Sequence, residues 1–403
     1  MSPFLQFIAA LVVIILAAKL GGYLSYRLGQ PSVLGELMVG IILGPSVLDV
    51  LHLPFFTDAH LGESIAHLAE VGVLLLMFIA GLDLHLSDLA KSGKVAALAG
   101  ILGVVFPMIL GAGTAVIFQM NATAAIFIGL ILSATSVSIS AQTLMELNVL
   151  RSRVGVGMLG AAVFDDVLVV LGLSMFIAFS DPGAGGGLAS IAWILIRMVL
   201  YVAAAIAIGV WVLPRASTWV DRLPISKGLI AFVFVTILIY AWSAEVLGSM
   251  AAITGAFLAG LMLSRSRVKE RIESGVSTLA YAVFVPIFFV NVGLSANARE
   301  LTAQTGLLFL VMTLVAIIGK ILGAGLGARL AGFNNLESLQ LGTGMMSRGE
   351  VGLIVASVGI VQGLIRQETF SAVVGVVIMT TLLTPPALRA LFNRRQPASL
   401  AGD

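Results

Sequence analysis

Apolar stretches of roughly 20 residues follow one another along almost the whole chain, and a helix of that length can cross the hydrocarbon core of a bilayer. Hydrophobic residues make up 59% of the 403 residues and charged residues only 10%, while the mean hydropathy is +1.11. Soluble domains are much more polar than this. We therefore expect an all-α polytopic membrane protein, in which every backbone polar group is satisfied within a helix.

The hydropathy pattern divides the chain into about 13 predicted transmembrane helices with short connections between them. Their ranges are 4–26, 32–50, 64–84, 95–119, 122–146, 154–180, 188–213, 228–245, 247–264, 276–295, 303–331, 338–363 and 369–392. Together they form one membrane domain over residues 1–395, followed by a short tail at 396–403. No soluble nucleotide-binding domain is expected.

Basic residues predict the orientation of these helices, because Lys and Arg accumulate in cytoplasmic loops. With the N-terminus outside and the C-terminus inside, the outside loops carry only Arg299 and Arg366. The inside loops and helix ends then carry Arg27, Lys91, Lys94, Arg151, Arg153, Arg215, Arg222, Lys227, Arg265, Arg267, Lys269, Arg271, Arg329, Arg389, Arg394 and Arg395. The small net charge of +2 gives no indication of a nucleic-acid partner.

Two sequence motifs occur twice, separated by the same odd number of predicted helices. The segment at 35–43 resembles that at 255–263, and the segment at 76–82 resembles that at 288–294. An odd displacement turns the second copy upside down in the membrane. This is the inverted repeat typical of secondary transporters.

The boundaries of this repeat follow from the two pairs of motifs. Repeat one is predicted at about 4–180 and repeat two at about 228–392, with a linker helix at about 188–213. Substrate sites of such proteins lie near the middle of the membrane, between the two repeats.

Two predicted helices in corresponding halves carry residues that weaken a helix. The stretch at 133–140 is rich in serine and threonine, and the stretch at 342–352 contains four glycines. Hydroxyl groups compete for backbone hydrogen bonds, and glycine lowers helix stability. Tight helix packing is one explanation for such small residues. A pair of discontinuous helices lining a binding site is the other.

Asp165 and Asp166 stand next to each other in an otherwise apolar stretch, and Lys320 lies near the middle of another. Each buried charge is costly in a membrane and therefore needs a partner or a water-filled cavity. Neighbouring residues of a helix point about 100° apart. We expect one aspartate to pair with Lys320 and the other to face a cavity.

Arg348, Glu350 and Glu70 also lie in predicted transmembrane helices and have less specific roles. Arg348 and Glu350 stand close together in the glycine-rich helix, where we expect them to compensate each other's charge. Glu70 is a candidate for the wall of a funnel that leads to the site.

In combination, these motifs resemble the second monovalent cation:proton antiporter family, which contains Kef-like and NapA-like proteins. The resemblance rests on the segment 29–45, the serine-rich stretch, Phe164-Asp165-Asp166, Lys320 and the segment 347–350. It implies an NhaA-type fold, in which a core domain with two crossed, discontinuous helices moves against a dimerisation domain.

The resemblance also assigns roles to individual residues. Asp166 would bind Na⁺ or a proton, and Asp165 would pair with Lys320. Thr135 and Ser136 would lie at the first helix break. Arg348 and Glu350 would form a polar pair at the second break.

The expected function is electrogenic Na⁺/H⁺ antiport by an elevator-like alternating-access mechanism. The expected partners are Na⁺ (or Li⁺ or K⁺), H⁺, the lipid bilayer and a second copy of the chain. The expected location is the cell (inner) membrane. No cofactor motif and no catalytic site is apparent, so an enzyme is not expected.

A K⁺/H⁺ antiporter or Kef-like K⁺ efflux transporter is the main alternative. The paired aspartates favour the sodium/proton members, because Kef-like members typically carry a neutral residue before the essential aspartate. A sodium-coupled symporter and a membrane sensor or channel are more distant alternatives.

Overall fold

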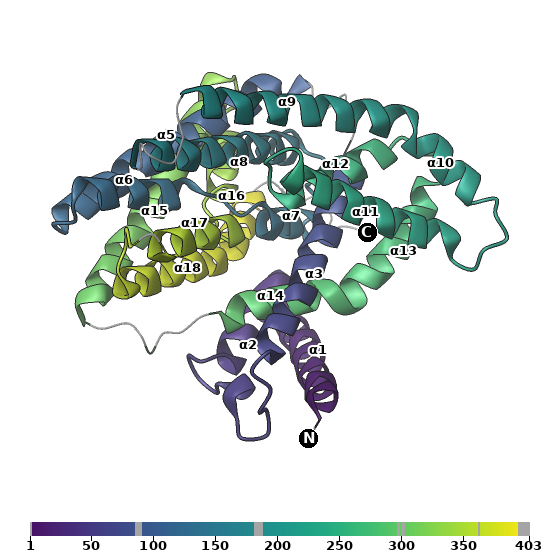
Figure 1. Cartoon of the computed structure of the whole chain (residues 1–403), viewed down its shortest axis with the longest axis horizontal. Coiled ribbons are helices and arrows are strands. Elements are labelled where there is room, and N and C mark those ends of the chain that lie inside the picture. The colour runs from purple at the N-terminus through teal and green to yellow at the C-terminus, as the bar shows by residue number, and fades with distance from the viewer. Residues whose placement is uncertain are drawn as a thin grey trace, which may run out of the picture.

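The computed structural model describes residues 2–84, 91–180, 188–295, 299, 303–361 and 363–393. All regular elements in this part of the chain are helices (Figure 1). Among the described residues, ten helical segments are long and apolar enough to cross a membrane, and three apolar helices are shorter. The predicted tail at 396–403 lies outside the described residues.

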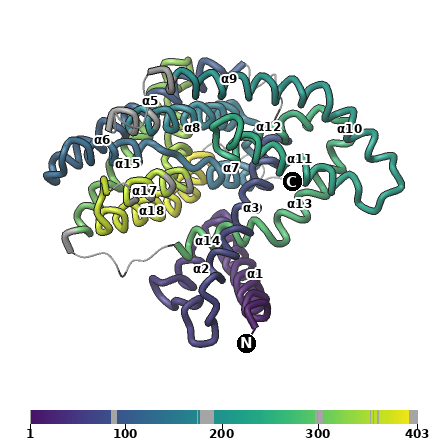
Figure 2. Tube along the Cα trace, viewed as in Figure 1, coloured from purple at the N-terminus to yellow at the C-terminus, as the bar shows by residue number. Residues whose placement is uncertain are grey.

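The first bundle joins an early and a late part of the chain. Its members are α1 (Pro3–Arg27), α2 (Ser32–Leu43), α3 (Leu61–Asp83), α11 (Gly228–Val246), α12 (Ala252–Leu263), α13 (Lys269–Leu279) and α14 (Val285–Leu294). A π-helical turn, η3 (Ala280–Phe284), connects α13 to α14, and a 3₁₀ turn, η1 (Val50–His52), lies between α2 and α3. Figure 2 shows the purple N-terminal helices beside the green α14.

The second bundle is assembled in the same way from two distant parts of the chain. Its members are α5 (Gly93–Ile117), α6 (Ala122–Ser133), α7 (Val137–Glu146), α8 (Arg153–Ser180), α15 (Ala303–Leu330), α16 (Asn335–Gly344), α17 (Glu350–Val361) and α18 (Gln367–Asn393). The helices α5 and α15 pack closely against each other and link its two halves.

Two helices connect the bundles. The long helix α9 (Leu188–Trp211) packs against α8 of the second bundle and against α12 of the first. It runs along the top of the molecule in Figure 1 and leads into α10 (Leu213–Val220). The amphipathic α10 was not expected from hydropathy, because it has only 8 residues and several of them are polar.

Close glycine contacts hold α3 against α12 in the first bundle. A Cβ atom on Gly260 would collide with the backbone oxygen of Phe78, and one on Gly81 would collide with that of Phe257. Small residues let two helix backbones approach each other in this way. The close contact of α3 with α12 is therefore possible only because both positions are glycine.

The same arrangement occurs between α2 and α14. A Cβ atom on Gly40 would collide with the backbone oxygen of Val290, and one on Gly293 with that of Leu37. These glycines belong to the motifs that occur twice in the sequence. The two helix pairs thus use equivalent positions of the two motif copies.

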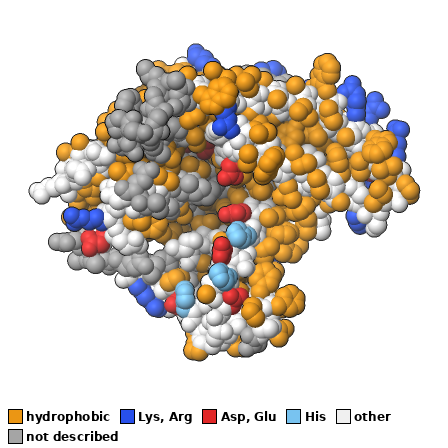
Figure 3. Space-filling model, in the orientation of Figure 1, with side chains coloured by type: hydrophobic (Ala, Val, Ile, Leu, Met, Phe, Trp, Pro, Cys, Tyr) orange, Lys and Arg blue, Asp and Glu red, His pale blue; other side chains and the backbone are white. Residues whose placement is uncertain are grey.

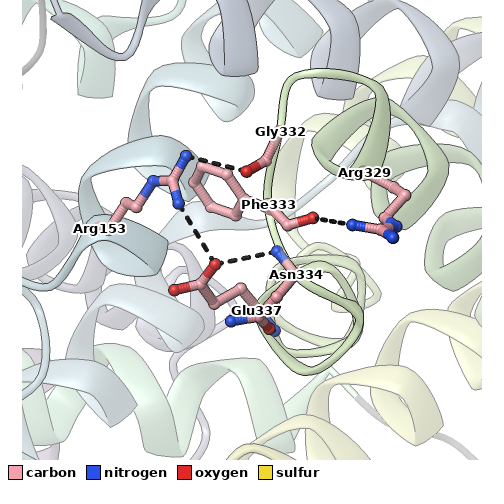
Figure 4. Close-up of polar contacts among 6 residues, drawn as sticks. All are labelled: Arg153, Arg329, Gly332, Phe333, Asn334 and Glu337. Atoms are coloured by element: carbon pink, nitrogen blue, oxygen red, sulfur yellow. Dashed lines mark hydrogen bonds and ion pairs between the residues drawn. The ribbon is translucent and has the colours of Figure 1, made fainter.

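The loop before α16 is fixed to the start of α8 by polar contacts (Figure 4). Arg153 stacks on the ring of Phe333 at 4.3 Å and donates to the backbone oxygen of Gly332 at 3.1 Å. Asn334 and Glu337 form a reciprocal capping box at the N-terminus of α16. These contacts align one discontinuous helix with the helix that carries the paired aspartates.

The helices agree with the hydropathy ranges in position but not always in length. The chain separates α11 from α12, as predicted, but the break covers residues 247–251, whereas the second helix was predicted to begin at residue 247. The helix predicted at 32–50 is shorter, because α2 ends at Leu43 and Gly44-Pro45 follows it. The segment predicted at 276–295 begins earlier, at Lys269.

We expect Gly260→Ala to lower the thermal unfolding temperature of the detergent-solubilised protein. The added methyl group must push α3 and α12 apart, and overpacking of this kind costs about 1–3 kcal/mol. The matched control is Gly113→Ala on α5, where a Cβ would meet no atom within 4 Å. Equal unfolding temperatures for the two variants would contradict the role of the glycine contact.

Candidate functional site

The two aspartates lie next to each other on α8, inside the second bundle. The exposed fraction is 0% for Asp165 and 5% for Asp166. Because successive residues on a helix diverge by about 100°, the two carboxylates meet different neighbours.

Asp165 forms a fully buried ion pair with Lys320 of α15. The Nζ atom of Lys320 donates to Oδ1 of Asp165 at 2.6 Å, and neither side chain is accessible to solvent. The other carboxylate oxygen of Asp165 is buried and accepts no hydrogen bond from the part of the chain that the structure describes. The desolvation penalty of burying both charges offsets much of their Coulombic attraction. Removal of one partner is destabilising, because it leaves the other charge buried and uncompensated. The pair is therefore sensitive to any third charge nearby.

Asp166 faces the first bundle instead. Thr254 of α12 donates through Oγ1 to Oδ2 of Asp166 at 3.4 Å. Both residues line a small cavity of about 10 Å³, together with Met77, Val137, Leu159, Val163, Ile253 and Phe257. A volume of about 10–15 Å³ is what a single water molecule requires. The space beside Asp166 thus has the size of one small occupant.

Both predicted helix breaks are present, and they face each other. The first lies between α6 and α7 at residues 134–136, and the second lies between α16 and α17 at residues 345–349. The backbone nitrogen of Ser136 donates to the backbone oxygen of Ser347 at 2.9 Å. The hydroxyl of Ser347 donates to the backbone oxygen of Ser136 at 2.6 Å. The two breaks therefore satisfy each other's exposed backbone groups.

The hydroxyls of the first break divide into bonded and unbonded groups. Ser140 donates to the backbone oxygen of Gly344, and Ser136 lies 3.1 Å from the hydroxyl of Ser138. Thr135 is 2% exposed, and its Oγ1 atom has no hydrogen-bond partner among the described residues. A buried hydroxyl without a partner is costly. Thr135 is therefore available to a ligand at the break.

Arg348 stabilises the second break through the backbone. Its guanidinium donates at 3.0 Å to the backbone oxygens of Met346 and Ala316, and it is only 1% exposed. Its charge also interacts electrostatically with Asp165. A cation suits this place, because the carbonyl end of α16 carries partial negative charge. Glu350 begins α17, but its side chain lies outside what the structure describes.

A hollow of about 940 Å³ separates the two bundles at one end. It opens where α3 and α12 begin and where α11 and α14 end. Glu70 of α3 and Glu245 of α11 line it, and both are exposed. Ile253 lines this hollow and also the small cavity beside Asp166. The hollow therefore approaches the aspartate to within one side chain.

Acidic and histidine side chains run down the middle of the face shown in Figure 3, and a broad hydrophobic surface lies to their right. Within the described residues, no three His, Asp or Glu side chains are grouped closely enough to hold a metal ion. A cation beside Asp166 would therefore need oxygen atoms from hydroxyls, the backbone or water as its remaining ligands.

The structure brings together most of the predicted site residues. Asp165, Lys320 and Arg348 interact with one another, and Thr135 and Ser136 lie at the break that faces Arg348's segment. Thr254 was missed. Its only sequence signal is a hydroxyl within an apolar helix, and nothing in the sequence relates it to Asp166.

Comparison with known proteins identifies the family to which the chain belongs. The family described as sodium/hydrogen exchanger, transmembrane, matches residues 12–394. The Na⁺/H⁺-K⁺ antiporter GerN of Bacillus cereus is 38% identical over 98% of this chain and 99% of its own length. A Na⁺/H⁺ antiporter of Enterococcus hirae is 36% identical over 96% of this chain and 98% of its own length.

A solved structure shows a similar fold. The sodium proton antiporter MjNhaP1 from Methanocaldococcus jannaschii superposes with a TM-score of 0.71. The alignment covers 97% of this chain and 98% of that protein, at 16% sequence identity. Together with the family match over residues 12–394, these similarities show that the chain belongs to the transmembrane sodium/hydrogen exchanger family.

Proposed function

We propose that this protein is a secondary active, electrogenic antiporter that exchanges Na⁺ for H⁺ at Asp166. The observation that carries this proposal is the place of Asp166. It lies at the junction of the two bundles, beside a cavity for one small occupant, and next to a buried aspartate–lysine pair. The family and the named functions of GerN and its relatives support the same class of transport.

Competition for one carboxylate explains exchange. A carboxylate neutralised by a proton offers no charge to Na⁺, and one that holds Na⁺ disfavours the proton. If the second bundle moves Asp166 from one side of the membrane to the other only when this carboxylate is neutralised, neither ion is transported without the other in the opposite direction. Thr135 and Ser136 at the first break are the proposed additional ligands.

The Lys320–Asp165 pair is the proposed source of electrogenicity. One Na⁺ exchanged for one proton at Asp166 alone would move no net charge. A Na⁺ ion at Asp166 adds a positive charge beside the pair and weakens the hold of Asp165 on Lys320, so that Lys320 gives up a second proton and one Na⁺ exchanges for two protons. Arg348 and Glu350 are assigned a structural role at the second break, and Glu70 a place in the wall of the entry funnel.

Alternating access is proposed to occur by an elevator-like motion. The second bundle, with its two crossed and discontinuous helices, would move against the first, while α9 acts as the linker. The hollow between the bundles is consistent with a state open toward the side where α3 begins. With about 13 membrane crossings in two inverted repeats, the N-terminus would lie outside and the C-terminus inside. A homodimer in the cell (inner) membrane completes the proposal.

Membership of the second cation:proton antiporter family, with its NhaA-type fold, is part of this proposal. A K⁺/H⁺ antiporter or K⁺ efflux transporter is the second candidate, since GerN is named a Na⁺/H⁺-K⁺ antiporter. Ion selectivity depends on the exact oxygen ligands at the site.

Proteoliposomes with an internal pH dye test the site. We expect Asp166→Asn to abolish Na⁺-driven proton flux, because the amide can hold neither ion by charge. Glu270→Gln on the exposed surface of α13 is the control and should transport normally. Sodium-driven flux retained by Asp166→Asn would remove this residue from the mechanism. In the same assay, a K⁺ gradient more effective than Na⁺ or Li⁺ would select the second candidate.

A double-mutant cycle tests the ion pair. Lys320→Gln leaves Asp165 buried without its partner, which should cost about 3–5 kcal/mol of stability if the carboxylate stays charged. The double variant Asp165→Asn/Lys320→Gln removes both charges and should recover most of the unfolding temperature. Additive losses in the double variant would show that the two side chains do not stabilise each other.

A further inference from the structure

The two bundles contact each other at the end opposite the hollow. There, α2 and α3 of the first bundle pack against α7 and α18 of the second. Arg151 donates to Asp83 at 2.6 Å across the same end. One end of the interface is thus open and the other closed, so the contacts at the closed end must hold this conformation.

Glu146 makes the shortest of these contacts. It is the last residue of α7, and its carboxylate accepts from the backbone nitrogen of Ser32 at 2.7 Å and from the Ser32 hydroxyl at 2.5 Å. Ser32 is the first residue of α2, and Pro31 before it supplies no side-chain cap. A carboxylate at a helix N-terminus satisfies free N–H groups and complements the helix dipole. The cap of α2 therefore comes from the other bundle.

A second residue of α7 holds Glu146 in place. Gln142 lies one turn earlier and donates through Nε2 to Glu146 Oε1 at 2.9 Å. Its own oxygen accepts from the hydroxyl of Tyr281 at 3.2 Å. Tyr281 belongs to the π-helical turn of the first bundle, and its backbone oxygen accepts from Lys19 at 2.6 Å. The contact therefore connects α7 to three elements of the first bundle.

Glu36 is a second acidic residue close to this contact. It lies one turn beyond Ser32 on α2, is 8% exposed, and interacts electrostatically with Glu146. Two acidic side chains in proximity oppose each other when both are charged. Lys19 of α1 interacts with Glu36 as well, with the opposite sign and more strongly than Glu146 does.

We propose that Glu146 is a latch that holds this end of the interface closed. It is a positioning residue, since it does not touch the proposed ion site. Glu146 must release α2 before the second bundle can present Asp166 to the side of the membrane at which the interface is now closed. The inference rests on the proposed alternating access and adds a residue that determines which side is open.

The absence of cysteine from the chain provides a direct test. Ala66→Cys places a single thiol on α3 in the wall of the hollow. The initial rate at which a membrane-impermeant maleimide labels it reports how long the hollow stays open. We expect Glu146→Gln to lower this rate by about tenfold, because the charge-assisted bonds to α2 are weakened. Ser32→Ala removes only the hydroxyl donor and should give a smaller decrease.

Glu270→Gln in the same single-cysteine background is the matched control and should label at the original rate. Thermal unfolding establishes that each variant is folded before labelling. If Glu146→Gln and Ser32→Ala are both folded and label at the original rate, the latch is refuted. The labelling rate requires no ion transport, so this outcome is independent of the flux result for Asp166→Asn.

Discussion

The burial of charged side chains in an apolar helix bundle is the constraint on which the rest of this structure depends. Lys320 and Asp165 are both inaccessible to solvent and form a 2.6 Å contact. The guanidinium of Arg348 donates to the backbone oxygen of Met346, in the break after α16, and to that of Ala316 in α15. In a membrane, irregular backbone is tolerated where protein surrounds it or where it lines a cavity. The helix breaks, the serine hydroxyls and the buried charges therefore require one another.

The helix positions and the two breaks could be predicted from the sequence, because hydropathy and clusters of glycine and serine are local signals. The contact between Thr254 and Asp166 could not be predicted, since the two residues are 88 positions apart along the chain. The contact between Ser32 and Glu146 joins residues 114 apart and places a cap on the other bundle. Such contacts depend on how the bundles pack, and no periodicity in the sequence reports this. The need to neutralise buried charge predicted that Lys320 pairs with one of the two aspartates, and only the family resemblance pointed to Asp165, which is its partner in the structure.

The contacts inside the first bundle differ in kind from those between the bundles. Inside it, glycine positions bring α3 against α12 and α2 against α14 so closely that an added methyl group would collide with backbone. Between the bundles lie a hollow at one end and polar, charge-based contacts at the other. Close backbone packing resists motion, whereas hydrogen bonds of side chains can be exchanged for water. This difference is what a rigid first bundle and a moving second bundle would require.

Proton release on sodium binding tests the central claim most directly. Na⁺ is added to the detergent-solubilised protein in a weakly buffered solution that contains a pH indicator, at a pH where the site is partly protonated. The account predicts that the wild-type protein releases protons as Na⁺ binds and that Asp166→Asn releases none. Sodium binding by the wild-type protein without any proton release would contradict competition at Asp166.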